Sequence, residues 1–130
     1  MKLIVSIVVD ANFGDRLDEL TQQGPVWIAD TPTNRSAAER WWKSHPGDHQ
    51  GVTIFKVAPG VRPEQSCLDI LPTVDLHYGA FDEYPPRYDV VEVWGATPTP
   101  ALVALLAENG CTEISRRVDG FQATRGYPTA

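Results

Sequence analysis

The stretch that decides the fold reads LIVSIVV at residues 3–9 and PVWIA at residues 25–29, with a polar helical segment and Gly24 between them. Both runs are almost continuously apolar, which is typical of strands that are covered on both faces. We expect the segment at 16–23 to be a helix that connects them, and such a right-handed crossover joins parallel strands. The chain therefore begins with a strand-helix-strand unit.

A second unit of the same kind lies near the other end of the chain. It contains a strand at 88–94, a helix at 101–109 and a strand that starts at Cys111. Thr99 is placed to cap this helix, Pro100 suits its first turn, and Gly110 stands just past its end. These local signals predict the boundaries of this helix better than those of any other element.

The chain between the two units adds one helix with a less certain beginning. Its start is predicted between Thr33 and Ser36, because Ser36 and Glu39 fit a capping box. It must stop by Ser44, since Pro46 and Gly47 cannot continue it.

The remaining elements are shorter. We expect a strand at 51–57, a short helix at 63–71 that ends at Pro72, and an edge strand at 112–117 that turns back into 121–125. These elements bring the total to about five strands and three or four helices. No segment is long and flexible enough to be an interdomain linker.

This alternation predicts a single α/β domain over residues 1–130, with a mostly parallel or mixed sheet flanked by three to four helices. Helices on both faces of the sheet would explain the apolar runs at 3–9 and 25–29. The alternative is a two-layer α+β ferredoxin-like plait, which the repeated strand-helix-strand unit would favour.

Composition limits the class of protein. The 130 residues are 42% apolar and 22% charged, as in a globular domain, and the net charge of −6 disfavours general binding to nucleic acid. Cys67 and Cys111 have no metal-ligand or redox spacing, so buried reduced thiols are expected. The N-terminal apolar run is too short for a signal peptide or a membrane span, which predicts a soluble cytoplasmic protein that does not contact membranes.

Carboxylates follow the first two strands. Asp10 and Asp30 are expected at the same edge of the sheet, where His49 could join them to form a general acid/base site or to hold a divalent cation such as magnesium. The competing interpretation is that these acids cap the following helices. No dedicated metal motif such as HExxH is present, and no cofactor is implied.

Two loops lead from a strand to a helix N-terminus, where free backbone amides can bind an anion. The first begins at Asn12 and the second spans 95–99. Neither has the glycine pattern of a nucleotide-binding loop, and two prolines in the second remove amide donors. Connection and helix capping explain both loops without a ligand.

Aromatic residues supply the other candidate site. Trp41 and Trp42 are adjacent on a helix, so their side chains point about 100° apart and one core surface cannot easily bury both. The segment 78–88 adds four residues of the kinds found in interface hot spots or in a loop folded back over the core: Phe81, Tyr84, Arg87 and Tyr88.

These features favour a protein-binding or self-associating module, most simply a homodimer, over an enzyme. A second hypothesis is a metal-assisted or general acid/base enzyme that uses the strand-end carboxylates. A third is an immunity protein or antitoxin, because a small acidic domain can neutralise a basic partner.

Overall fold

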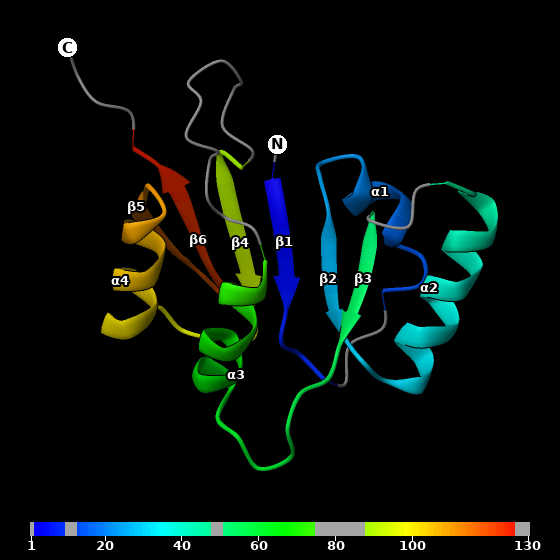
Figure 1. The fold of residues 1–130 in the computed structure, drawn as a ribbon, viewed down its shortest axis with the longest axis horizontal. Helices are drawn as coiled ribbons and strands as arrows, with labels where there is room; N and C mark the ends of the chain where they lie inside the picture. Colours follow the sequence, from blue (N-terminus) through cyan, green and yellow to red (C-terminus); the bar gives the residue numbers. More distant parts are fainter. Residues whose placement is uncertain (1, 10–12, 48–50, 75–87, 127–130) are drawn as a thin grey trace.

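The protein folds around one six-stranded sheet with the strand order β3-β2-β1-β4-β6-β5 (Figure 1). The computed structural model describes residues 2–9, 13–47, 51–74 and 88–126. Strands β1 to β4 are mutually parallel, and β6 runs antiparallel to both β4 and β5. The strands are β1 (Lys2–Ser6), β2 (Val26–Ala29), β3 (Val52–Phe55), β4 (Val90–Trp94), β5 (Cys111–Arg117) and β6 (Gly120–Arg125).

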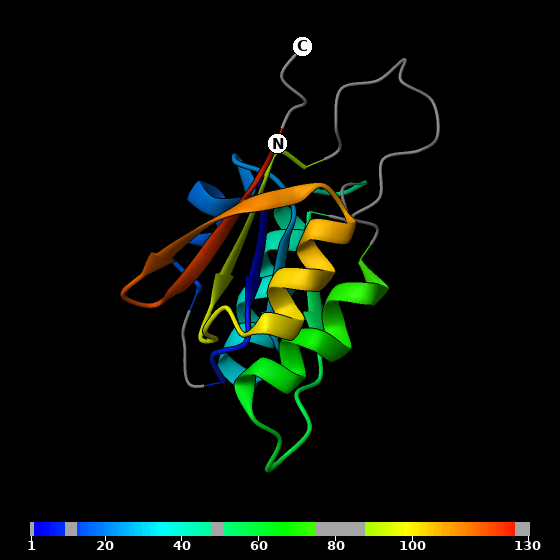
Figure 2. The same ribbon diagram turned by 90° about the vertical axis from the view of Figure 1, so that its left-hand side faces the viewer.

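Helices cover both faces of this sheet (Figure 2). One face carries α1 (Leu17–Thr21) and α2 (Pro32–Ser44), and the other carries α3 (Pro63–Ile70), the short 3-10 helix η1 (Leu71–Thr73) and α4 (Pro100–Glu108). The three-layer α/β domain is thereby confirmed, with six strands in place of about five. A ferredoxin-like plait has helices on only one face of its sheet, so this alternative is excluded.

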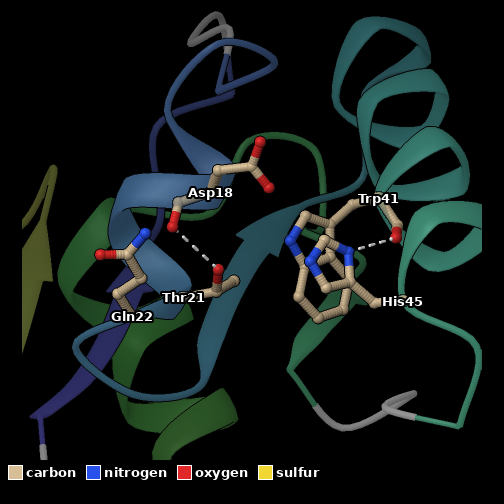
Figure 3. A pocket seen from close by; sticks show the side chains of 5 residues that line it. All are labelled: Asp18, Thr21, Gln22, Trp41 and His45. Atoms are coloured by element: carbon tan, nitrogen blue, oxygen red, sulfur yellow. Dashed lines mark hydrogen bonds between the residues drawn. The ribbon is translucent and has the colours of Figure 1, made fainter.

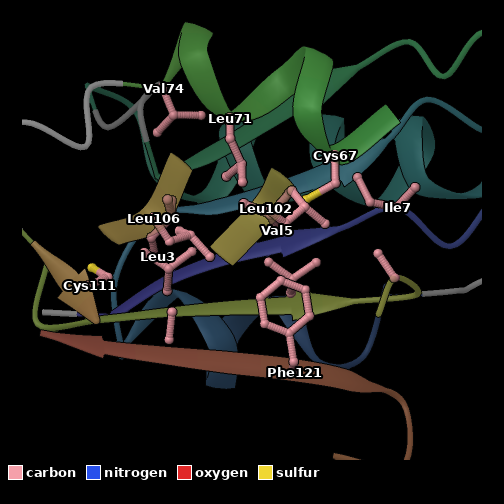
Figure 4. Close-up of a cluster of buried hydrophobic side chains, with 14 of the residues drawn as sticks. Leu3, Val5, Ile7, Cys67, Leu71, Val74, Leu102, Leu106, Cys111 and Phe121 are labelled. Atoms are coloured by element: carbon pink, nitrogen blue, oxygen red, sulfur yellow. The ribbon is translucent and has the colours of Figure 1, made fainter. Parts of the chain in front are cut away.

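The apolar run at the start of the chain is explained by its position in the centre of the sheet. Successive side chains of a strand point to opposite faces. Leu3 and Val5 enter the core under α3 and α4, whereas Ile4 enters the core under α1 and α2, and all three are fully buried. Figure 4 shows the first of these cores, where Leu102 and Leu106 of α4 lie over β1.

The start of α2 differs from the prediction. The helix begins at Pro32, and the hydroxyl of Thr31 caps it by accepting a hydrogen bond from the backbone N–H of Asn34 over 3.0 Å. The proposed capping box of Ser36 and Glu39 is therefore wrong, because both residues lie inside the helix. The predicted end at Ser44 is confirmed.

The C-terminal part of the chain follows the prediction closely. Thr99 accepts a hydrogen bond from the backbone N–H of Leu102 over 3.4 Å, and α4 starts at Pro100. Strand β5 is the edge of the sheet and turns back into β6. The second strand-helix-strand unit thus exists, but β6 separates its two strands, whereas β1 and β2 of the first unit are direct neighbours.

Polar side chains line the part of the α1/α2 face that β4, β6 and β5 form. Glu92, Gln122 and Ser115 share one row across these three strands. Glu92 is almost fully buried and pairs with Lys2 Nζ at 3.2 Å and with Arg117 on the far strand. An antiparallel sheet with one solvated face has this pattern.

Among the described residues, no helix is long and apolar enough to cross a membrane.

Candidate functional site

The strand-end carboxylate that the structure describes is already paired. Strands β1 and β2 are parallel, so Asp30 lies at the expected edge of the sheet, while Asp10, Asn12 and His49 lie outside the described residues. Arg35 of α2 donates two hydrogen bonds to the Asp30 carboxylate, from Nε at 3.1 Å and from Nη2 at 2.7 Å. The hydrogen bonds and charge of this guanidinium lower the pKa of Asp30. Asp30 therefore anchors the first turn of α2 as an ion pair, and the cap itself is Thr31.

This pairing predicts a dependence of stability on pH. Because the pKa of Asp30 is lowered in the folded state, its ionised carboxylate stabilises the fold above the pKa of the unfolded chain, about 3.9. That contribution is lost as the pH falls through the lower folded-state value. Urea unfolding should show Asp30→Asn less stable than the wild type at neutral pH, with the difference shrinking below about pH 4. An equal difference at every pH would contradict this role, and the exposed Asp15→Asn serves as control.

The loop after β4 borders a cavity of about 230 Å³ beside the turn between β5 and β6. Here the hydroxyl of Thr97 donates a hydrogen bond to Oε1 of Glu64 over 2.8 Å, which lowers the pKa of that carboxyl. The ionised carboxylate places negative charge beside the N-terminus of α4, where an anion would bind. The electrostatics of this loop thus oppose the anion site that the sequence allowed there.

The loop before α1 is tied to α2 by a residue that the sequence reasoning missed. Asn34 is fully buried; its Oδ1 accepts a hydrogen bond from the backbone N–H of Phe13 at 3.4 Å, and its Nδ2 donates to the carbonyl of Ala29 at 3.1 Å. A signal was present in the sequence, because Asn34 stands on the same helical stripe as Ala37 and Trp41. A polar residue in a buried stripe has an internal partner as a rule.

The two adjacent tryptophans of α2 have different surroundings. Trp41 is 6% exposed and belongs to the core beneath α1 and α2, where its ring stacks on His45 with centroids 4.1 Å apart. Trp42 is half-buried, and its Nε1 donates a hydrogen bond to the carbonyl of Val52 at 3.1 Å. Tyr88 is buried in the core of the opposite face, and Phe81, Tyr84 and Arg87 lie outside the described residues.

A cavity of about 570 Å³ lies between α1 and α2 (Figure 3). Trp41 of α2 and His45, which follows α2 directly, form one wall. The Nε1 of Trp41 and one ring nitrogen of His45 face α1, whose Asp18 extends its carboxylate toward α2. The Nε1 of Trp41 is buried, and it has no hydrogen-bond partner among the described residues. Helix α1 and the residue after it form the rest of the lining, with Asp18, Thr21 and Gln22.

Hydrogen bonding fixes which atoms of this cavity are donors and which are acceptors. The Nδ1 of His45 lies 2.9 Å from the carbonyl oxygen of Trp41, and since a carbonyl only accepts, Nδ1 carries the proton. The outer nitrogen, Nε2, is then an acceptor in the neutral ring. The hydroxyl of Thr21 donates to the carbonyl of Leu17 at 2.6 Å. Apart from the exposed amide of Gln22 at the rim, the cavity therefore offers one unused donor, from Trp41, and acceptors from Asp18 and His45.

The two cysteines are buried thiols, as expected. Burial raises the pKa of Cys67 to about 12 and also raises the pKa of Cys111. Because the nucleophilic form of cysteine is the thiolate, both side chains are inert near neutral pH. Within the described ranges, no group of three or more histidine, cysteine, aspartate or glutamate side chains is arranged to hold a metal ion.

Comparison with known proteins finds no relative. Neither a family model, nor a curated protein, nor a solved structure matches this chain.

Proposed function

We propose that this protein is a binding module that associates with a polypeptide partner, in the simplest case a second copy of itself, through the surface around the α1–α2 cavity. The observation that carries this proposal is the buried indole N–H of Trp41, which has no acceptor among the described residues. A buried donor without a partner costs about 1–3 kcal/mol. A partner that supplies an acceptor removes this cost on binding.

The surroundings of Trp41 have the composition of a recognition site. Tryptophan is enriched among the residues that dominate binding energy, especially in a desolvated centre with a polar rim. Trp41 is the buried centre here, and the exposed Asp18 and Gln22 form the rim on the side of α1. The stacked ring of His45 restricts the indole to one orientation, which lowers the entropy lost on binding.

The strand-end carboxylate of Asp30 and the two cysteine thiols, which could serve in catalysis, are not available for it. Both oxygens of Asp30 are bonded to Arg35, and a carboxylate in that state is a poor general base and a poor ligand for a cation. The thiols of Cys67 and Cys111 are protonated. Binding is thus better supported than the enzyme hypothesis, and we propose no second function.

Two matched variants test this proposal. Trp41→Phe keeps an aromatic ring over His45 but removes the unused N–H, whereas Trp42→Phe removes an N–H that already donates to Val52. We expect Trp41→Phe to weaken self-association about tenfold or more, as truncation of a hot spot does, and Trp42→Phe to leave it unchanged. Sedimentation velocity over a range of micromolar concentrations measures the dissociation constant.

Melting temperatures of both variants show whether each is folded. A wild-type protein that remains monomeric throughout the concentration series counts against self-association. Equal effects of the two substitutions on the dissociation constant would remove the special role of the Trp41 indole.

A further inference from the structure

We infer that the α1–α2 cavity binds a primary carboxamide, the side-chain group of asparagine or glutamine. This inference rests on the proposed function and names the group that the partner inserts. It follows from matching three groups that face one another across the cavity, the unused N–H of Trp41 and the acceptors of Asp18 and His45, to a single chemical group.

The donor requires that the ligand carry an acceptor. The Nε1 of Trp41 is buried and turned toward α1, in the direction of the cavity (Figure 3). A guanidinium or an ammonium group has no acceptor and leaves this N–H unpaired. The positively charged side chains of a basic partner are thereby excluded as the group that contacts Trp41.

The acceptors require that the ligand also carry donors. The carboxylate of Asp18 accepts only, and the Nε2 of His45 accepts while Nδ1 holds the proton. A carboxylate ligand has no donor and is repelled by Asp18. A hydroxyl group has a single O–H donor and therefore satisfies only one of the two acceptors.

A primary carboxamide supplies the complete set. Its carbonyl oxygen accepts from Trp41, and its two N–H groups are available to Asp18 and His45. A main-chain peptide unit has one N–H and satisfies one acceptor fewer.

The chain itself carries such a group at the rim of the cavity. Gln22 is exposed and follows α1 directly. In a two-fold dimer, any contact from one copy to the other is made twice, so Gln22 of each copy could enter the cavity of its mate. The other source of a carboxamide is an asparagine or glutamine of a different protein.

Indole N–H resonances provide a direct test. The chain has four tryptophans, so a ¹⁵N-labelled sample gives four indole cross-peaks, and Trp41→Phe identifies the one of interest. Acetamide, N-methylacetamide and N,N-dimethylacetamide carry the same carbonyl with two, one and no N–H groups. We expect acetamide to move the Trp41 peak saturably, with an affinity on the order of millimolar for so small a ligand. The peak of Trp42, whose N–H is bonded to Val52, should stay in place.

The carboxamide inference predicts the order in which the three amides bind. Acetamide should bind most tightly and N,N-dimethylacetamide least, and Asp18→Ala should weaken acetamide binding about tenfold, the loss expected for one hydrogen bond to a charged group. Glu19→Ala, an exposed neighbour on α1 that does not line the cavity, should have no effect. Equal affinities for the three amides, or a Trp41 peak that acetamide does not move, would overturn the carboxamide inference.

The Gln22→Ala variant identifies the source of the carboxamide group. Loss of self-association in this variant, with acetamide binding retained, identifies the second copy as the source, and unchanged self-association points to another protein. If the protein forms a dimer that depends on Trp41 but does not bind acetamide, the carboxamide inference is refuted and the proposed function stands. A monomer whose Trp41 peak responds to acetamide would refute self-association but keep the carboxamide site.

Discussion

Replacement of Gly120 by alanine is expected to lower the free energy of unfolding by about 3 kcal/mol or more, since a backbone clash inside a sheet cannot relax locally. Gly120 opens β6 and pairs with Trp94 of β4. A Cβ atom at this position would collide with the carbonyl oxygen of Val93 and lie 2.9 Å from its carbonyl carbon. To remove the collision, β6 must move away from β4, which breaks the ladder between the parallel and the antiparallel parts of the sheet.

Gly60→Ala is a suitable control for this experiment. Gly60 has a φ of +76°, so alanine is strained there, but nothing lies within 4 Å of its added Cβ. The expected cost is about 1 kcal/mol, the usual penalty for an alanine in this backbone conformation. Urea unfolding followed by tryptophan fluorescence measures both variants. A Gly120→Ala protein as stable as Gly60→Ala would show that the two strands are less closely packed than the structure indicates.

Asn34→Ala is expected to cost about 2–6 kcal/mol, because each of two backbone groups left without its partner costs about 1–3 kcal/mol when buried. These groups are the N–H of Phe13 and the carbonyl of Ala29, which connect the loop before α1 and the end of β2 to α2. The fully buried side chain leaves no room for solvent to replace both bonds. The same denaturation experiment measures this loss.

Two further variants sharpen this second prediction. Thr33→Ala changes the exposed neighbour on α2 and should alter stability by less than about 0.5 kcal/mol, as surface substitutions do. Asn34→Asp keeps an acceptor for Phe13 but loses the donor to Ala29 and buries a charge, so it should be at least as unstable as Asn34→Ala. An Asn34→Ala protein with the stability of Thr33→Ala would show that the Asn34 hydrogen bonds contribute nothing net.

Local signals in the sequence were sufficient for α4 and failed for α2 in an informative way. A threonine followed by proline starts both helices, at Thr99 and at Thr31. The prediction used this signal for α4 but preferred the pair Ser36 and Glu39 for α2, although a capping box inside a helix is only a coincidence of residue types. The burial of β1 on both faces was predictable for a similar local reason, since its apolar run is continuous.

The strand order was beyond the reach of the sequence because pairing between distant strands leaves no periodic signal. The arrangement of the candidate site likewise leaves no periodic signal in the sequence. Trp41 and Trp42 were predicted to need two different surfaces, and the fold provides both within itself, since α2 contacts α1 on one side and β3 on the other. The cavity depends on how α1 sits against α2, and the spacing of residues along either helix does not encode that distance.

The central position of β1 has a consequence for how the chain is made on the ribosome. Strand β1 is synthesised about ninety residues before β4, with which it pairs along its whole length from Lys2 to Ser6. Until β4 emerges, the nascent half-sheet of β1, β2 and β3 has an open edge at β1, and the core beneath α3 and α4 cannot close. The sheet therefore cannot be completed before β4 has emerged, so the packing of residues 2–6 waits for residues 90–94.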